Sequence, residues 1–327
     1  MNMKYETLKD LKKEIHQQIA GLMSKNCVLL NTPNHVNIGD ILIWQGEIDF
    51  LKSINIEPSY TTSNFNFDWR DFDEETLILL HGGGNFGDIW EYHQDFRKEV
   101  IKKYPKNRIL IFPQSVEYNN KEAMKEDAVL FSKHNNITIC TRDSHSYTLL
   151  KEHFKNNILM VPDMAFCMDI AKKSNKPNKN ILLLKRNDRE LSETISYKNL
   201  EKIEILDWPT FNPSFKNSYY RVIEKLSKVF SKPALSKNRI DTTFGFCVKR
   251  DKNWQINSGI QFISNYKYVA STRLHGHILS LLLNVSSVMI DNSYGKNSRF
   301  YDTWLKDMPQ SSLVKSTEEI AEKLKTL

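Results

Sequence analysis

The chain has 327 residues, of which 40% are hydrophobic and 26% are charged, and its formal net charge at pH 7 is +7. This length leaves room for two domains of ordinary size, and the composition excludes the disordered and fibrous classes of protein. No apolar run reaches the ~18 residues that a membrane-spanning helix needs, and residues 1–25 predict a charged amphipathic helix instead of a signal peptide.

Predicted strands and helices alternate along the sequence. In the first half, apolar runs predict strands at 27–31, 76–80, 108–112, 137–141 and 158–161, with helices at 41–54, 121–134 and 144–154 and one that ends near 103. In the second half, strands are predicted at 181–184, 203–206, 268–270 and 285–290, with helices at 254–264, after 271 and at 316–325. This alternation is typical of parallel sheets with helices on both faces.

A polar stretch at 171–180, rich in Lys and Asn, is the best candidate for a linker. It separates a first predicted domain at 1–170 from a second at 181–315. The predicted fold class is therefore α/β, with two Rossmann-like domains that face each other across a cleft.

Residues 267–304 carry the densest set of candidate functional side chains. Two predicted strands flank a helix there, so two strand ends point the same way. Arg273 and His275 follow the first strand, and Lys296 follows the second. A fixed cation, an imidazole and a helix N-terminus at such strand ends suit a small anion with a phosphate or a carboxylate. His277 lies nearer the apolar stripe of the helix and is predicted to be structural, whereas His275 can reach the cleft.

The segment 81–88 is the sharpest local signal. Gly82, Gly83, Gly84 and Asn85 form a predicted turn between a strand and a helix, where glycines let the backbone approach a ligand closely. The glycine spacing formally matches the dinucleotide-binding fingerprint. However, the turn does not follow the first strand, and no acidic residue ends the next strand to hold a ribose. A turn shaped only for packing is the other alternative.

Three further predicted element ends carry charged side chains. Asp40 stands at the start of a predicted helix, where it is either a helix N-cap or a general base that acts on a hydroxyl. Arg142 and Arg186 follow strands in the first and second halves. Cations at strand ends in both halves are the arrangement that an anion bound in the cleft needs.

Cysteine usage and charge distribution bear on location and partners. The four cysteines form no CxxC pair, which indicates reduced thiols of a cytoplasmic protein and predicts no metal site. Residues 216–252 hold ten Lys or Arg against three Asp or Glu, an excess equal to the net charge of the whole chain. This segment also contains aromatic residues. It is predicted to be either an ordinary solvated surface or a peripheral contact with the inner face of a membrane, and nucleic acid is not expected as a partner.

Six segments together resemble the polysaccharide pyruvyl transferases. They are HGGGNFGDIW (81–90), FPQS (112–115), RDSHS (142–146), PDMAF (162–166), STRLHGHILSLLLN (271–284) and DNSYGKNSRFYDTW (291–304). Six motifs in the right order are far more specific than any one of them. The resemblance implies a two-domain fold similar to GT-B glycosyltransferases, with a closing helix at 316–327 that packs back on the first domain.

The resemblance also implies an activity. It is the transfer of enolpyruvate from phosphoenolpyruvate to two hydroxyls of a sugar, which makes a pyruvate ketal on an exopolysaccharide, capsule or cell-wall precursor. Phosphoenolpyruvate is then a co-substrate, no cofactor is expected, and the acceptor is expected to be a lipid-linked oligosaccharide. By the resemblance, Arg273 matches the donor-binding arginine and His275 the catalytic histidine. The candidates added from position are Arg142, Arg186 and Lys296 for the donor and Asp40 as the base.

Two alternatives to this activity stay open at the level of sequence. A GT-B glycosyltransferase needs a base-stacking pocket and a ribose-binding acid in the second half, and the sequence has no clear candidate for either. A non-catalytic protein of the same fold that binds an anion or a sugar would keep its function after the substitution His275→Ala.

Overall fold

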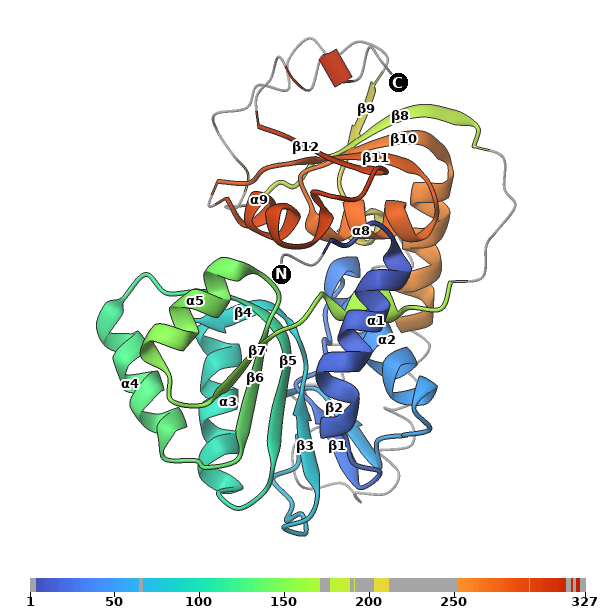
Figure 1. The fold of residues 1–327 in the computed structure, drawn as a ribbon. Coiled ribbons are helices and arrows are strands. Elements are labelled where there is room, and N and C mark those ends of the chain that lie inside the picture. The colour runs from blue at the N-terminus through green and yellow to red at the C-terminus, as the bar shows by residue number, and fades with distance from the viewer. Residues whose placement is uncertain are drawn as a thin grey trace. The chain divides into compact units, whose positions relative to one another are not determined.

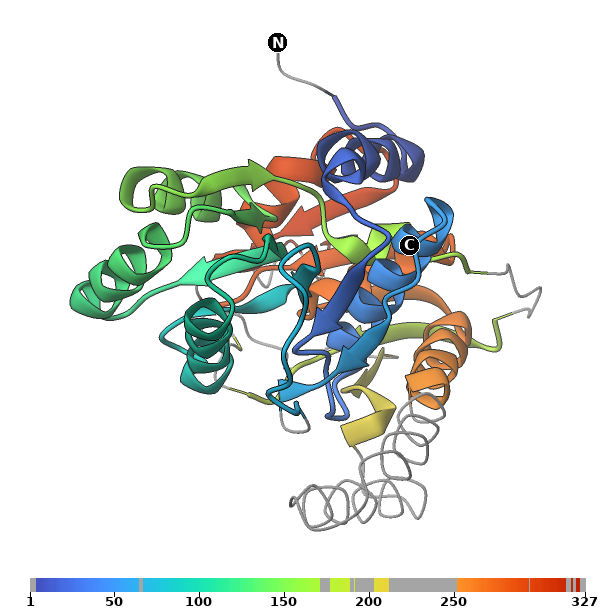
Figure 2. The ribbon, with the colours of Figure 1, turned by 90° about the horizontal axis from the view of Figure 1, so that it is seen from below.

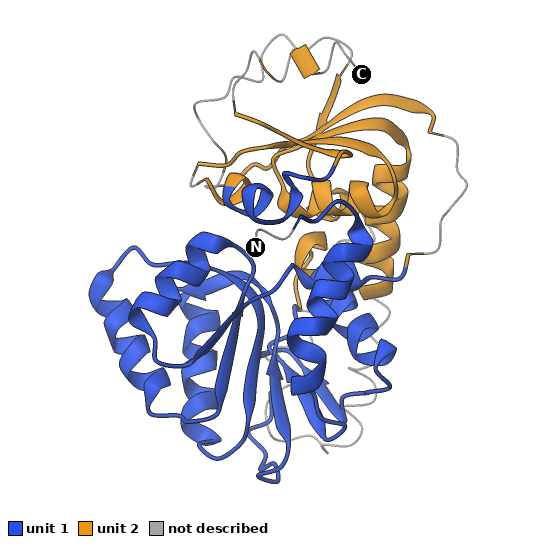
Figure 3. Cartoon of the chain, viewed as in Figure 1, with its two compact units in different colours: residues 1–33, 43–169, 299–308 blue, residues 34–42, 170–298, 309–327 orange. Residues whose placement is uncertain are grey.

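The computed structural model describes residues 4–64, 67–170, 177–188, 191, 203–211, 252–293, 295–315, 319 and 322–323. The chain forms two compact units (Figure 3). Unit 1 consists of Met1–Pro33, Ile43–Asp169 and Arg299–Met308, and unit 2 consists of Asn34–Leu42, Ile170–Ser298 and Pro309–Leu327. The segment Asn34–Leu42, which contains Asp40, therefore belongs with the second unit although it lies early in the sequence.

Unit 1 is built on a parallel sheet (Figure 1). Its strands are β1 (Cys27–Leu30), β2 (Tyr60–Thr62), β3 (Leu77–Leu80), β4 (Gly83–Gly87), β5 (Ile109–Glu117), β6 (Ile137–Thr141) and β7 (Asn157–Met160). The strand order is β2-β1-β3-β5-β6-β7, and β4 pairs with β5 beside this path. The helical elements are α1 (Leu8–Ile19), η1 (Ala20–Leu22), α3 (Glu91–Lys103), α4 (Lys121–Ser132), α5 (Ser144–His153), η3 (Met164–Cys167) and η5 (Tyr301–Leu305). Helix α2 (Ile38–Ser53) starts in unit 2 and continues in unit 1.

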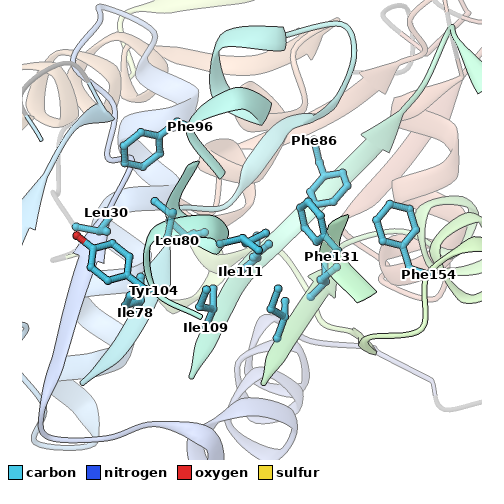
Figure 4. Packing of buried hydrophobic residues seen from close by; sticks show 14 of the residues in the cluster. Leu30, Ile78, Leu80, Phe86, Phe96, Tyr104, Ile109, Ile111, Phe131 and Phe154 are labelled. Carbon is cyan, nitrogen blue, oxygen red and sulfur yellow. The ribbon is translucent and has the colours of Figure 1, made fainter. Parts of the chain in front are cut away.

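The core of unit 1 lies between one face of this sheet and helices α3, α4 and α5 (Figure 4). Strands β1 and β3 are buried at every position, as expected for parallel strands that are covered on both faces. Alternate strand residues, such as Ile78 and Leu80, pack in one cluster with Phe96 of α3 and Phe131 of α4. Helix α1 lies on the opposite face of the sheet, as the two views in Figures 1 and 2 show.

Unit 2 is built on a second parallel sheet. Its strands are β8 (Lys179–Leu184), β9 (Ile203–Leu206), β10 (Tyr266–Ser271), β11 (Ser286–Ile290) and β12 (Ser311–Val314), in the order β12-β11-β10-β8-β9. The helical elements are η4 (Pro209–Phe211), residues 252–264, α8 (Leu274–Leu282) and α9 (Lys296–Phe300), of which α9 continues into unit 1. The buried residues Leu183, Ala270, Val288, Ile290 and Val314 form a core cluster on the sheet.

Each sheet has a point where the strand order reverses. In unit 1 the chain passes from β1 to β2 on one side and then to β3 on the other side. In unit 2 it passes from β8 to β9 on one side and then to β10 on the other side. Ligands of open parallel sheets bind outside the carboxyl ends of the strands at such switch points. The residues that follow β1, β3, β8 and β10 are therefore the first candidates for functional residues.

The predicted fold class, α/β with two Rossmann-like domains of the GT-B-like kind, is confirmed by these two parallel sheets and by the solved structure reported below. The predicted glycine turn is wrong, because Gly83–Gly87 form strand β4 and helix α3 begins only at Glu91. Strands β2, β4 and β12 were not predicted. The first and last of these are short edge strands, and the glycines of β4 have a low intrinsic strand preference.

Two predicted segments fall mainly outside the described residues. The basic segment 216–252 lies outside them apart from Lys252, and the closing helix at 316–327 lies outside them apart from residues 319, 322 and 323. The roles predicted for both segments, and the predicted cleft, stay predictions. The predicted limits of 1–170 and 181–315 place residues 34–42 in the first domain and 299–308 in the second, whereas the structure groups them with unit 2 and unit 1, respectively.

Candidate functional site

Two arginines and two aspartates gather at the switch point of unit 2. Arg186 and Asp188 follow β8, Asp207 follows β9, and Arg273 follows β10. Strands β8 and β10 pair in parallel, so these loops leave the sheet at the same edge. The hydroxyl of Thr272 joins the loops, because it accepts the N–H of Arg186 at 2.9 Å and donates to the carbonyl that ends β8 at 3.2 Å.

Arg273 is held from two sides by its neighbours. Its Nε and Nη2 donate to Oδ1 and Oδ2 of Asp207 at 2.5 and 2.7 Å. The guanidinium carbon lies 5.0 Å from the ring centroid of Phe211. The side chain is only 10% exposed, and a planar guanidinium that is paired at one edge and stacked on a ring is fixed in orientation. Arg273 can therefore present its remaining N–H groups to an anion in one fixed direction.

Asp188 bridges the two arginines. Nε and Nη2 of Arg186 donate to Oδ1 and Oδ2 of Asp188 at 2.6 and 3.1 Å, and the same Oδ2 lies 3.5 Å from Nη2 of Arg273. The Arg186 side chain is 12% exposed, whereas that of Asp188 is 45% exposed. Two guanidinium groups of unit 2 thus converge on one carboxylate, whereas the sequence predicted cations at strand ends in both halves.

His275 lies against the first turn of α2. A Cβ atom added to Gly39 would come within 2.8 Å of Nδ1 and 3.2 Å of Cγ of His275. The side-chain oxygen of Asn37 accepts the N–H of Gly39 at 3.2 Å and so caps this turn. Asp40 follows Gly39 directly. The structure therefore brings His275 together with the turn that carries Asp40, within one unit.

Asp40 is the third residue of α2, and the helix N-cap interpretation is therefore wrong. The capping side chain belongs to Asn37, because Asn37 precedes the first helical residue, Ile38. The Asp40 carboxylate accepts from Nδ2 of Asn37 at 2.8 Å and lies 3.4 Å from Nε2 of His35. A negatively charged side chain in a first helical turn interacts favourably with the helix dipole.

His277 is a structural histidine, as predicted. It is fully buried, and its ring nitrogens pair with the hydroxyls of Ser311 at 2.7 Å and Ser287 at 2.8 Å. Burial lowers the pKa of His277 from its ordinary value of 6.5 to about 3, so this imidazole is neutral at pH 7. It joins α8 to β11 and β12 and takes no part in the candidate site.

The segment Asp291–Trp304 supports the strand ends of the site. The amide of Asn297 donates to the carbonyls of Thr272 at 3.1 Å and Ile290 at 2.8 Å, and so ties the loops after β10 and β11 together. The backbone N–H of Lys296, a predicted donor contact, donates to the side chain of Asn292 at 2.7 Å. Arg299 pairs with Glu117 of β5 at 3.1 Å, within unit 1. Tyr294, in the same segment, lies outside the described residues.

Arg142, a predicted donor contact, belongs to unit 1 and is enclosed there. Its Nη1 donates to Asp163 at 2.6 Å and its Nε donates to the hydroxyl of Ser115 at 2.9 Å. The side chains of Arg142 and Asp163 are 3% and 1% exposed. This ion pair joins the ends of β6 and β7, and the structure does not group Arg142 with Arg186 and Arg273.

The glycines of the predicted turn are required by close backbone packing. A Cβ atom on Gly82 would lie 2.8 Å from the carbonyl oxygen of Pro113, and one on Gly87 would lie 1.9 Å from that of Glu117. Gly83 and Gly87 have φ angles of 128° and 110°, in the region that favours glycine. Both the main-chain and the side-chain oxygen of Asn85 accept from the buried Arg97. These contacts agree with the packing interpretation.

Two carboxylates near the switch points, one in each unit, were missed from the sequence. Asp207 directly follows the predicted strand 203–206, so a charged residue at a strand end was the available signal. Glu47 has no comparable signal, because it lies in the middle of α2, far from any strand end. Its carboxylate accepts the N–H of Gly82 at 2.8 Å and pairs with Nδ1 of His81 at 2.8 Å.

Within the described part of the chain, none of the helices has the length and apolar character needed to cross a membrane. The same residues contain no group of three or more His, Cys, Asp or Glu side chains placed to hold a metal ion.

Comparison with known proteins adds independent findings. Residues 37–294 match the family model described as polysaccharide pyruvyl transferase. The chain is 32% identical over 308 residues to EpsO of Bacillus subtilis, a candidate pyruvyl transferase, with 92% of this chain and 93% of EpsO covered. It is 29% identical over 299 residues to Pyruvyl transferase 1 of Schizosaccharomyces pombe, with 86% of this chain and 70% of that protein covered.

A solved structure supports the fold. The crystal structure of an uncharacterised protein from Klebsiella pneumoniae matches with a TM-score of 0.62 at 18% identity, and the match covers 94% of this chain and 99% of that one.

Proposed function

Because the chain belongs to the polysaccharide pyruvyl transferase family, we propose that it transfers enolpyruvate from phosphoenolpyruvate to two hydroxyls of a sugar. The product is a pyruvate ketal on an exopolysaccharide, capsule or cell-wall precursor. Phosphoenolpyruvate is the co-substrate, and no cofactor is proposed. The proposed place of action is the cytoplasm, where the acceptor is proposed to be a lipid-linked oligosaccharide.

The observation that supports this function is the convergence of Arg186 and Arg273 on one carboxylate at the switch point of unit 2. Phosphoenolpyruvate carries both a carboxylate and a phosphate, and guanidinium groups match the geometry of each. His275 follows Arg273 by two residues, at the start of α8. Cations for the donor and an imidazole thus come from the ends of two adjacent strands, β8 and β10.

The proposed chemistry starts with His275 as general acid. His275 gives a proton to the methylene carbon of phosphoenolpyruvate, which becomes a methyl group and leaves a cationic centre at C2. A sugar hydroxyl adds at C2 and loses its proton to a carboxylate, for which we propose Asp40. The bond between C2 and the phosphate oxygen then breaks, phosphate leaves, and a second hydroxyl closes the ketal with loss of its own proton.

The electrostatics of the site bear on the charge of His275. A bound dianion favours the charged form. We expect phosphoenolpyruvate to raise the protonated fraction of His275, which an NMR titration of the imidazole measures. An unchanged pKa on donor binding contradicts the proposed acid role.

The test of the proposed function is release of phosphate from phosphoenolpyruvate in the presence of a galactoside or N-acetylhexosamine acceptor. The substitutions Arg273→Ala and His275→Ala are expected to slow this release at least about tenfold, since a general acid contributes about 10²–10⁴-fold. Activity with a nucleotide sugar and none with phosphoenolpyruvate would overturn the proposal.

A further inference from the structure

We infer that the carboxylate of Asp188 competes with the carboxylate of phosphoenolpyruvate for Arg186 and Arg273, and that Asp207 is the residue that positions Arg273 for the donor. This inference rests on the proposed function. The carboxylate seat is the place that Asp188 now occupies beside Arg186 and Arg273, and the inference assigns it to the carboxylate of the donor. The inference also gives opposite roles to the two aspartates that contact Arg273.

The contacts of Asp188 are those that a substrate carboxylate would make. Its two oxygens take the paired edge of Arg186 at 2.6 and 3.1 Å, and one of them also reaches Arg273 at 3.5 Å. The place next to the two arginines already holds a carboxylate, whose two oxygens match the planar fork of the Arg186 guanidinium. The seat also lies at the switch point of the sheet, where ligands of such folds bind. We therefore assign it to the donor's carboxylate.

The two aspartates differ in how firmly they are held. Asp207 is 11% exposed and pairs with Arg273 through both oxygens, whereas Asp188 is 45% exposed and reaches Arg273 only at 3.5 Å. Trp208, next to Asp207, is buried, and Thr210 donates a 2.6 Å hydrogen bond to the carbonyl of Val36. An exposed ion pair contributes little, whereas breaking an enclosed pair is costly. Asp188 can therefore give up its place, and Asp207 stays.

Loss of the negative charge is expected to change the affinity for the donor in opposite directions at Asp188 and at Asp207. The four side chains form a neutral set as long as both carboxylates contact the arginines. When a substrate carboxylate takes the place of Asp188, the two arginines still contact two carboxylates, so no further cation is needed to neutralise the bound substrate group. Removal of the Asp188 charge leaves one positive charge in excess and favours an incoming anion, whereas removal of the Asp207 charge releases Arg273 from its fixed orientation.

The test is calorimetric titration of the full chain and of four variants, Asp188→Asn, Asp207→Asn, Asp207→Glu and Glu204→Gln, together with kcat and KM from the release of phosphate. Each variant is titrated with phosphoenolpyruvate, with pyruvate, which has the carboxylate but no phosphate, and with inorganic phosphate. Glu204 is the matched control, because it lies on β9 three residues before Asp207. It pairs at 2.8 Å with Lys179, which starts β8, whereas Arg186 and Arg273 follow the ends of their strands. Circular dichroism and thermal unfolding check that each variant is folded.

We expect Asp188→Asn to bind phosphoenolpyruvate and pyruvate about fivefold more tightly, the size of one exposed ion pair, with a smaller gain in the affinity for inorganic phosphate. We expect Asp207→Asn to bind phosphoenolpyruvate about tenfold more weakly and to raise KM more than it lowers kcat, with partial recovery in Asp207→Glu. Glu204→Gln is expected to match the wild type.

The outcomes separate this inference from the function on which it rests. If the wild type binds phosphoenolpyruvate but Asp188→Asn binds it equally or less tightly, the inference is wrong and the function stands. If the gain appears with phosphate and not with pyruvate, the seat belongs to the phosphate and the assignment is overturned. If Asp207→Asn lowers kcat alone, Asp207 does not position Arg273 for binding. If the wild type does not bind phosphoenolpyruvate at all, the proposed function and the inference both fail.

Discussion

The switch points of the two sheets occupy equivalent places in their units but have opposite characters. In unit 1, Asn31 follows β1 and His81 follows β3, and both residues are buried. His81 pairs with the fully buried Glu47, whose other oxygen accepts the N–H of Gly82. In unit 2, the corresponding ends of β8 and β10 carry Arg186 and Arg273 around a half-exposed carboxylate.

This difference shows that position at a strand end does not by itself make a binding residue. Enclosed charged groups can hold adjacent loops together. Glu47 accepts the N–H of Gly82 and pairs with His81, and Arg142 pairs with Asp163. Partly exposed groups, such as Asp188, can exchange a protein partner for a substrate. The same residue types therefore serve stability in unit 1 and, under the proposed function, substrate binding in unit 2.

The largest expected effect separates the two kinds of arginine. Arg142→Met leaves the carboxylate of Asp163 buried without its cation and is expected to lower the free energy of unfolding by about 3 kcal/mol or more. Arg186→Met, whose partner is half exposed, is expected to change it by less than about 1 kcal/mol and to abolish most of the binding of phosphoenolpyruvate. Urea unfolding and calorimetric titration measure the two quantities. Equal losses of stability for both variants would contradict the distinction between an enclosed ion pair at Arg142 and a half-exposed one at Arg186.

The next effect concerns the acid stability of unit 2. The folded pKa of His277 is about 3 and its ordinary value is 6.5, so the unfolded chain binds a proton in this window that the folded chain does not. The contribution of His277 to stability is therefore complete above pH 6.5 and declines as the pH falls, by up to about 1.4 kcal/mol per pH unit. His277→Asn is expected to be less stable at pH 7.5 and to lose less stability between pH 6.5 and pH 5, as measured by urea unfolding. Parallel pH profiles for the two proteins would contradict this.

The smallest expected effect tests the placement of His275. Gly39→Ala introduces a methyl group where Nδ1 of His275 lies and forces the imidazole to move. We expect a loss of about tenfold in kcat, since small misplacements of a catalytic group are costly. Gly21→Ala is the matched control, because a Cβ atom there would meet nothing within 4 Å. If both variants keep full activity, His275 does not act from the position described.

Much of the site could be predicted because the relevant residues follow recognisable strands. Arg273 and His275 come after an apolar run, and Arg186 comes after another, so their placement at strand ends follows from local pattern alone. His277 could be separated from His275 because helical periodicity places it nearer the buried face. Asp207 could have been found in the same way, from its place after β9.

Other features could not be predicted because they depend on contacts between distant segments. The glycines at 82–87 resemble a ligand-binding turn in sequence, but pairing with β5 makes them a strand. Asp40 precedes nearly all of unit 1 in the chain, yet its turn packs against His275 of unit 2. Arg142 resembles Arg186 in sequence, and only the enclosing partners Asp163 and Ser115 distinguish them.

The sequence by itself determined the order of strands and helices, the α/β class and the short list of charged residues at strand ends, because periodicity and composition are local properties. The tertiary structure decided which of those charges are enclosed and which can exchange partners, because burial and ion pairing depend on segments far apart in the chain. In this protein that decision separates Arg142, locked against Asp163, from Arg186 and Arg273, which converge on the replaceable carboxylate of Asp188.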